Sequence, residues 1–216
     1  MRLLSALSAM AILLLALSCD KKAQNPAEFG HFEDGRYQNT YFGLTITLPE
    51  DWHVLSKQQI EAMTNVAKMA AGNNQKLKEQ YEKYMERTST LVTAFMYPIP
   101  KKDGYNPSFG CTAENMKFYP GMKSGKDFLE SYMASRMKGQ VKATFPEQIK
   151  KISINGSHFF MLPIESFFNT YHVKQKYFVT ASKGYFLTFL ATYESQIDYD
   201  KIDNIIKSIR LQSGKT

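Results

Sequence analysis

The stretch Tyr185-Phe-Leu-Thr-Phe-Leu-Ala-Thr-Tyr193 decides the fold, because it is a nearly continuous apolar strand. A strand of this kind is buried on both faces, so helices should cover both sides of its sheet. The chain continues through a short acidic loop into isoleucines at an i, i+3, i+4, i+7 spacing, which predicts a helix with one apolar stripe. The predicted contact joins six side chains, three from the strand and three from the helix: Phe186, Phe189, Leu190, Ile202, Ile205 and Ile209.

An antiparallel meander precedes this strand. Asn155-Gly156 is a strong two-residue hairpin signal, because both positions tolerate positive φ. It joins predicted strands at 151–154 and 158–168, and a third follows at 173–181. Alternating or β-branched patterns predict strands at 44–48, 90–97 and 109–116. Helical patterns predict helices at 56–87, interrupted at 72–74, at 124–137, and from Asp198 or Asp200 onward.

Residues 1–19 resemble the export signal of a bacterial lipoprotein. A short positive start is followed by an apolar core at 3–17, and small Ser18 directly precedes Cys19. Ala16 departs from the leucine that is usual three positions before the cysteine. The resemblance implies removal of 1–18 and attachment of palmitate-type lipid to Cys19. The apolar run is short for a transmembrane helix, which needs about 20 residues.

The remaining sequence predicts a tether and one domain. Residues 19–36 are polar and irregular and read as the lipidated tether, and 37–212 as the domain. A total of 216 residues with 44% hydrophobic content suits this division. The predicted location is the cell membrane, facing the periplasm in a Gram-negative host. Asp20 resembles the inner-membrane retention signal of enteric bacteria.

The formal net charge of +7 favours an anionic partner, such as an acidic envelope protein or an anionic polymer. The lysines are scattered rather than clustered, which favours a solvated surface over a dedicated patch. Nucleic acid does not suit an exported protein.

Two segments resemble the ends of PsbP-like domains. Phe42-Gly-Leu-Thr-Ile-Thr-Leu-Pro-Glu-Asp-Trp52 is similar to their entry strand. Gly184–Tyr193, with the isoleucine helix after it, is similar to their ending. The resemblance covers about 37–211 and implies an α+β fold, an α/β/α sandwich with a mainly antiparallel central sheet and helices on both faces. That family has no shared catalytic motif, so the resemblance implies scaffold or binding duty.

The sequence contains only weak signals of a catalytic or metal-binding site. His31, His53, His158 and His172 have no metal-ligand spacing, so no metal or cofactor is predicted. His158 and His172 flank strands that could be neighbours, which leaves a histidine pair open. Cys111 could be a nucleophile, but it alternates with Phe109 and Ala113 on one apolar face, which favours core packing.

Two surfaces are candidates for partner binding. The loop at 98–107 contains Lys101, Lys102 and Tyr105, although its polar composition favours a solvated connection over a binding loop. Tyr81 and Tyr84 lie on the charged helix, where they could also pack against the sheet. We therefore expect a non-catalytic binding or assembly role at the cell envelope. The alternatives are a small envelope hydrolase using Cys111 or a histidine pair, and a ligand-binding lipoprotein that serves a transporter.

Overall fold

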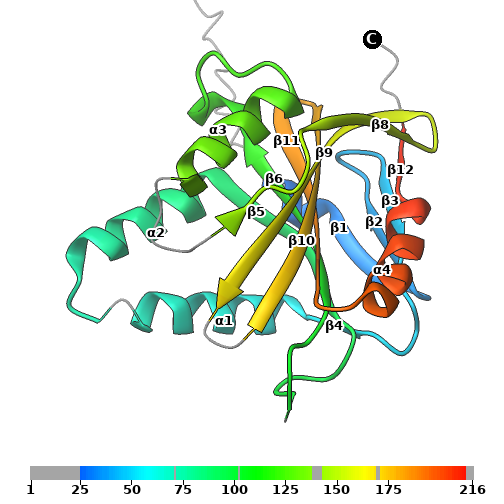
Figure 1. Ribbon diagram of the computed structural model, residues 1–216, viewed down its shortest axis with the longest axis horizontal. Helices are drawn as coiled ribbons and strands as arrows, with labels where there is room; N and C mark the ends of the chain where they lie inside the picture. The colour runs from blue at the N-terminus through cyan, green and yellow to red at the C-terminus, as the bar shows by residue number, and fades with distance from the viewer. Residues whose placement is uncertain (1–24, 71, 102, 138–142, 169–170, 213–216) are drawn as a thin grey trace, which may run out of the picture.

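The computed structural model describes residues 25–70, 72–101, 103–137, 143–168 and 171–212. Within them the chain forms two antiparallel sheets and four α-helices, an α+β fold (Figure 1). The predicted export signal and Cys19 lie outside the described residues.

The larger sheet has the strand order β4-β5-β6-β11-β10-β9-β7. Strand β8 also pairs with β9, along the first part of that strand, whereas β7 pairs further along it. The apolar strand β11 (Tyr185–Tyr193) lies in the middle, between β6 (Ser108–Asn115) and β10 (Tyr171–Ser182). Its central position explains the continuous apolar run, because both of its faces are covered. The other strands of this sheet are β4 (His53–Val54), β5 (Thr88–Phe95), β7 (Ala143–Thr144), β8 (Lys150–Ile154) and β9 (Ser157–Phe168).

A second, four-stranded sheet was not expected from the sequence. Its order is β1-β2-β3-β12, and its strands are β1 (Gly30–Glu33), β2 (Arg36–Asn39), β3 (Leu44–Thr47) and β12 (Arg210–Leu211). The alternation at 44–48 predicted β3, but β1, β2 and β12 have no alternating apolar pattern that would identify them.

The folded part begins before the predicted tether ends. The 3-10 helix η1 (Pro26–Phe29) and strand β1 fall within residues that the sequence suggested were irregular. The buried side-chain amide of Asn39 donates a hydrogen bond to the carbonyl oxygen of Pro26 over 2.8 Å. This bond ties η1 to β2, so the residues that could act as a free connection are fewer than predicted.

The helices are α1 (Lys57–Ala70), α2 (Gln75–Arg87), α3 (Gly125–Met137) and α4 (Gln196–Ser208). The predicted interruption of the first helical run is present, and the Asn74 side chain caps α2 by accepting from the Leu77 amide. Helix α4 begins earlier than predicted. Ser195 is its N-cap and forms a reciprocal capping box with Asp198.

Both faces of the large sheet are covered, by α3 on one side and by α4 with the small sheet on the other (Figure 1). Phe189 belongs to the cluster that contains Ile202 and Ile205, as predicted. The prediction for Phe186 and Leu190 was wrong, because both lie in the cluster beneath α3. Side chains alternate along a strand, so these two positions cannot share a face with Phe189.

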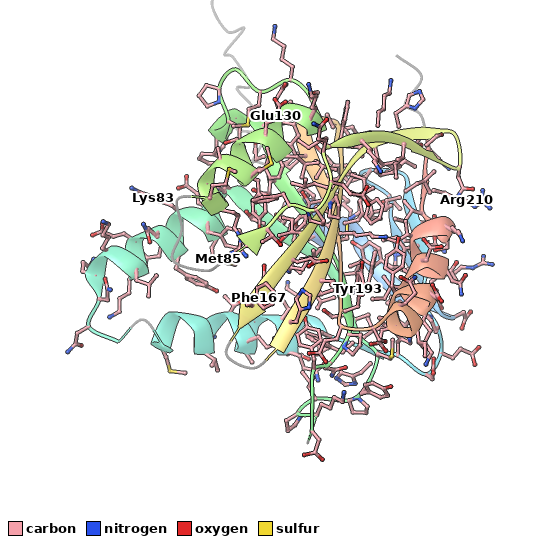
Figure 2. The ribbon with its side chains drawn as sticks, in the orientation of Figure 1. Lys83, Met85, Glu130, Phe167, Tyr193 and Arg210 are labelled. Atoms are coloured by element: carbon pink, nitrogen blue, oxygen red, sulfur yellow. The ribbon has the colours of Figure 1, made fainter. Side chains whose placement is uncertain are left out.

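Helices α1 and α2 form a hairpin that projects away from the sheet (Figure 1). The Tyr81 hydroxyl of α2 donates to the carbonyl oxygen of Thr64 on α1 over 3.0 Å, which joins the two helices. Lys83 and Met85 leave α2 on different sides (Figure 2). Within the described ranges, no helix combines the length and the apolarity needed to cross a bilayer.

Candidate functional site

Two cavities border strand β5, and Thr90 lines both of them. The pairing of β5 with β6 shifts register between Thr90 and Val92, so Leu91 is an extra residue in a β-bulge. A bulge increases local twist and re-aims side chains, and bulges are frequent beside functional sites. Here the bulge allows one strand to contribute to both cavities.

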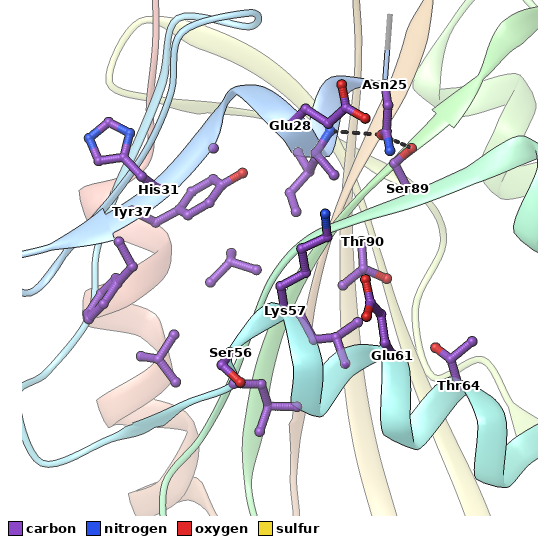
Figure 3. A pocket seen from close by; sticks show the side chains of 18 of the residues that line it. Asn25, Glu28, His31, Tyr37, Ser56, Lys57, Glu61, Thr64, Ser89 and Thr90 are labelled. Atoms are coloured by element: carbon purple, nitrogen blue, oxygen red, sulfur yellow. Dashed lines mark hydrogen bonds between the residues drawn. The ribbon is translucent and has the colours of Figure 1, made fainter.

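The first cavity, which we call the β1–α1 cavity, has a volume of about 450 Å³. Figure 3 shows it between η1 and β1 on one side and the first turns of α1 on the other, with β5 behind. Apolar side chains line its interior: Ala27, Tyr37, Val54, Leu55, Ile60, Leu91 and Val92. The volume lies within the range of about 300–1,000 Å³ that is common for small-molecule sites.

The charged residues of the β1–α1 cavity are exposed and lie at its rim. They are Glu28, His31, Lys57 and Glu61. The amino group of Lys57 points from α1 into the cavity, and His31 lies at its edge (Figure 3). An apolar interior with a charged rim suits a ligand that has an apolar body and a charged end.

Short-range hydrogen bonds fix both walls of this cavity. At the start of α1, the Ser56 amide donates to the Gln59 side chain over 2.9 Å, and the Gln59 amide donates to the Ser56 hydroxyl. On the other wall, the Asn25 side-chain oxygen accepts from the Ala27 amide and from the Ser89 hydroxyl, each over 3.1 Å. The second of these bonds holds η1 against β5.

The second cavity, which we call the Gly110 cavity, lies on the face of the large sheet that α3 covers only in part. Its volume is about 410 Å³. Three threonines from neighbouring strands lie side by side along its floor, because Thr112 pairs with Thr90 on one side and with Thr188 on the other. In the next row Gly110 pairs with Thr93 and Leu190, and one row further Ser108 pairs with Thr192. The floor therefore has hydroxyl groups in the rows on either side of Gly110, with Thr93 and Leu190 beside the glycine itself.

Tyrosine rings form the walls of the Gly110 cavity. Tyr84 comes from α2, Tyr132 from α3 and Tyr177 from β10. The hydroxyl oxygens of Tyr132 and Tyr177 lie 2.7 Å apart in a hydrogen bond, and the rings are tilted with centroids separated by 4.9 Å. Together these residues place aromatic surface opposite the hydroxyl-rich floor.

Glu114 lies at one end of the Gly110 cavity. Burial raises the pKa of its carboxyl group, against the lowering effects of a hydrogen bond from the Tyr119 hydroxyl and of the nearby Arg87 charge. The Arg87 guanidinium lies over the Tyr119 ring, 5.5 Å from its centroid. Glu114 is the one ionisable acid or base, other than tyrosine, among the described residues that line this cavity.

The structure places two of the predicted partner-binding residues at the Gly110 cavity. Tyr84 lines it directly, and the Tyr105 hydroxyl forms hydrogen bonds with Ser108 and Thr192 of its floor. Burial raises the pKa of the Tyr105 phenol more than these bonds lower it.

The other three candidates lie elsewhere. Tyr81 joins α2 to α1, and the Lys101 amino group donates to the carbonyl oxygen of Tyr105 within its own loop. Lys102 lies outside the described residues.

The groups considered for catalysis do not come together. Cys111 is fully buried on the core face of β6, and burial raises the pKa of its thiol well above the ordinary value. His158 lies nine residues before Phe167, which pairs with His172. At about 3.3 Å per residue this places the two histidines roughly 30 Å apart. Among the described residues no group of three or more His, Cys, Asp or Glu is arranged to hold a metal ion.

Sequence reasoning missed the hydroxyl floor of the Gly110 cavity. The signal was available as small or polar residues at every second position, 108 to 114 in one strand and 188 and 192 in another. Their meeting depends on the register between β5, β6 and β11, which a single sequence does not state.

No protein-family model and no curated protein matches the chain. Several solved structures are similar to it, and two of them are compared below. The solution structure of cyanobacterial PsbP (CyanoP) from Synechocystis sp. PCC 6803 shares 13% identity, with 82% of this chain and 91% of that chain covered and a TM-score of 0.46. The crystal structure of LpqN, involved in cell envelope biogenesis of Mycobacterium tuberculosis, shares 12% identity, with 79% and 83% covered and a TM-score of 0.45. At these identities the similarities assign no role to any residue of the two cavities.

Proposed function

We propose that the chain is a lipid-anchored, non-catalytic binding protein of the cell envelope that holds an anionic amphiphile in the β1–α1 cavity. The observation that carries the proposal is the position of Asn25. This residue lines the cavity and is six positions after Cys19. Six residues span at most about 20 Å, so a lipid on Cys19 keeps the cavity beside the bilayer.

The chemistry of the cavity supports an amphiphile. Its interior buries hydrocarbon favourably, at roughly 25 cal/mol per Å² of apolar surface removed from water. Two of the four rim residues with ionisable side chains are carboxylates, Glu28 and Glu61, so the proposed contact for an anionic end group is Lys57, whose amino group points inward. The wider partner proposal, an acidic envelope protein or anionic polymer, follows from the net charge of +7.

The low reactivity expected of the buried Cys111 thiol supports a binding role over a catalytic one. The thiolate is the reactive form of a cysteine, and a buried thiol with a raised pKa holds little of it near neutral pH. The histidine-pair alternative is weakened for a different reason, because His158 and His172 lie too far apart to act together.

Binding is tested with oleate as the probe and a chain that begins at Asp20, since all described elements lie between Pro26 and Leu211. We expect saturable binding by calorimetry, weakened about fivefold by Lys57→Glu, which corresponds to about 1 kcal/mol for a rim ion pair. Lys201→Glu on α4, an exposed charge reversal away from the cavity, is the control. Absence of oleate binding, or equal losses in the two variants, would remove the cavity from the proposal.

The anchor is tested separately in cells. Metabolic labelling with a palmitate analogue should mark the wild-type protein and not Cys19→Ala. Equal label on both proteins would refute the lipid anchor while leaving the oleate result intact.

A further inference from the structure

We propose that the Gly110 cavity binds the uncharged pyranose ring of a saccharide. The site is distinct from the β1–α1 cavity, so the inference stands or falls independently of the function proposed above. Four observations carry it: the open space at Gly110, the hydroxyl floor, the tyrosine walls, and the near absence of charge.

The open space includes the position where a side chain on Gly110 would begin. A Cβ placed on Gly110 would meet nothing closer than the carbonyl oxygen of Val92, at 3.9 Å. Gly110 does not have a positive φ, so the turn geometry that usually favours glycine does not explain it. Glycine within a strand weakens the strand and often marks a bulge or the close approach of a ligand or another backbone. The bulge here lies in the partner strand β5, between Thr90 and Val92, and not at Gly110 itself.

The floor offers hydroxyl groups, which both donate and accept hydrogen bonds. Thr188 is 6% exposed and lines the cavity, and its hydroxyl has no hydrogen-bond partner. A buried polar group without a partner is costly, and most such groups in proteins are satisfied. A ligand hydroxyl would satisfy it. The Thr90, Thr112 and Ser108 side chains line the same space from neighbouring positions.

The walls and the charge narrow the ligand class. A pyranose ring carries hydroxyls around its edge and presents C–H groups on its faces, which suit the rings of Tyr84, Tyr132 and Tyr177. The described lining contains no lysine, arginine, histidine or aspartate, and its single carboxylate, Glu114, would repel an anion. An uncharged sugar fits this lining, and a phosphate or a sugar acid does not.

The ring could belong to a free glycan or to a glycolipid headgroup, and two probes separate these sources. The first probe set consists of two trisaccharides, maltotriose and the N-acetylglucosamine trimer, each tested alone in solution. The second is vesicles that contain glucosyl diacylglycerol, compared with vesicles of phosphatidylcholine alone. Binding is measured by calorimetry for the trisaccharides and by co-sedimentation for the vesicles, using the chain that begins at Asp20. Binding in either arm supports the proposal, and the arm that responds identifies the source.

Two variants test the location. Gly110→Val places a side chain in this open space and should weaken binding at least tenfold. Thr188→Val replaces a hydroxyl with a methyl of the same shape and should weaken it several-fold. Thr45→Val, a half-buried threonine on β3 outside both cavities, is the matched control and should change nothing. Protection of the buried Cys111 thiol reports whether each variant is folded.

The proposal is overturned if neither trisaccharide nor glycolipid vesicle binds the wild-type protein. It is also overturned if folded Thr188→Val and Thr45→Val bind as the wild type does. Tighter binding of glucuronate than of glucose would contradict the uncharged class.

Discussion

At the scale of single residues, burial rather than sequence motif decides what Cys111 can do. The side chain is 0% exposed and belongs to the core cluster that contains Phe109 and Ala113. Desolvation disfavours the thiolate, which explains the raised pKa of the thiol. A thiol reagent can reach it only after the sheet opens.

We therefore predict that Cys111 reacts with a thiol reagent at least about a thousandfold more slowly in the native protein than in denaturant, because typical unfolding free energies begin near 5 kcal/mol. A labelling time course on the chain that begins at Asp20 measures this. The same chain with Lys201→Cys supplies an exposed thiol as the control. Fast native labelling of Cys111 would restore the hydrolase alternative.

Glu114 is a second titratable group whose pKa is raised by burial, although its carboxyl group also has hydrogen-bonding and charged neighbours. Its pKa in the folded protein is raised above the ordinary value of 4.5, mainly by desolvation. Between the unfolded and folded pKa values the folded state binds more protons, so stability falls as pH rises through this interval. Above the folded pKa the loss is constant.

Glu114→Gln removes this titration. We predict that the free energy of unfolding of the variant, relative to the wild type, increases from pH 4 to pH 7. Urea unfolding at a series of pH values measures the difference. Glu33→Gln, at an exposed position on β1, is the control and should show a flat difference. A flat difference for Glu114→Gln as well would mean that the carboxyl group is not desolvated.

At the scale of elements, the alternation of β11 distributes its side chains between two cores. Phe189 faces α4 and contacts the Phe159 ring with centroids 5.7 Å apart. Phe186 faces α3 and contacts Phe128 at 5.0 Å. One strand therefore joins the two clusters, and a defect in it affects both layers.

We predict that Phe189→Ala lowers the free energy of unfolding by about 3–5 kcal/mol, the usual cost of truncating a fully buried phenylalanine. Ile197→Ala on α4 removes a side chain that is 73% exposed and should change stability by no more than about 0.5 kcal/mol. Chemical denaturation of both variants provides the comparison. A loss below about 1 kcal/mol for Phe189→Ala would be inconsistent with its place in the core.

At the scale of the whole molecule, Asn25, the described residue nearest in sequence to the predicted anchor, lines the β1–α1 cavity and not the Gly110 cavity. Tyr132 and Tyr177 of the Gly110 cavity come from α3 and β10. A chain held at Cys19 by a short connection thus brings the first cavity next to the membrane. In the proposed arrangement, the anionic amphiphile and the saccharide are bound at separate sites.

Asp20, the residue after the predicted lipidation site, leads to a prediction about which membrane holds the protein. In an enteric host, Asp20 should retain the protein mainly in the inner membrane, and Asp20→Ser should move most of it to the outer membrane. Lys21→Ser is the control and should leave the distribution unchanged. Sucrose-gradient fractionation gives the result, and wild-type protein found mainly in outer membranes would contradict the retention hypothesis.

Local patterns alone predicted many of the elements. The continuous apolar run of β11, the hairpin signal at Asn155-Gly156 and the interruption before Asn74 each act over a few residues, so the sequence displays them directly. The same holds for the core position of Cys111, which follows from alternation with its neighbours.

Only the tertiary structure determined the small sheet and the two cavities. Strand β1 has no alternating apolar pattern, and β12 has only two residues and pairs with β3 across most of the chain length. The hydroxyl floor needs Thr90, Thr112 and Thr188 in register across three strands. Register and long-range pairing arise from packing of the whole chain, whereas periodicity and turn chemistry arise from neighbours in sequence. The sequence alone therefore determined most of the longer elements, and not the short strands or the sites between elements.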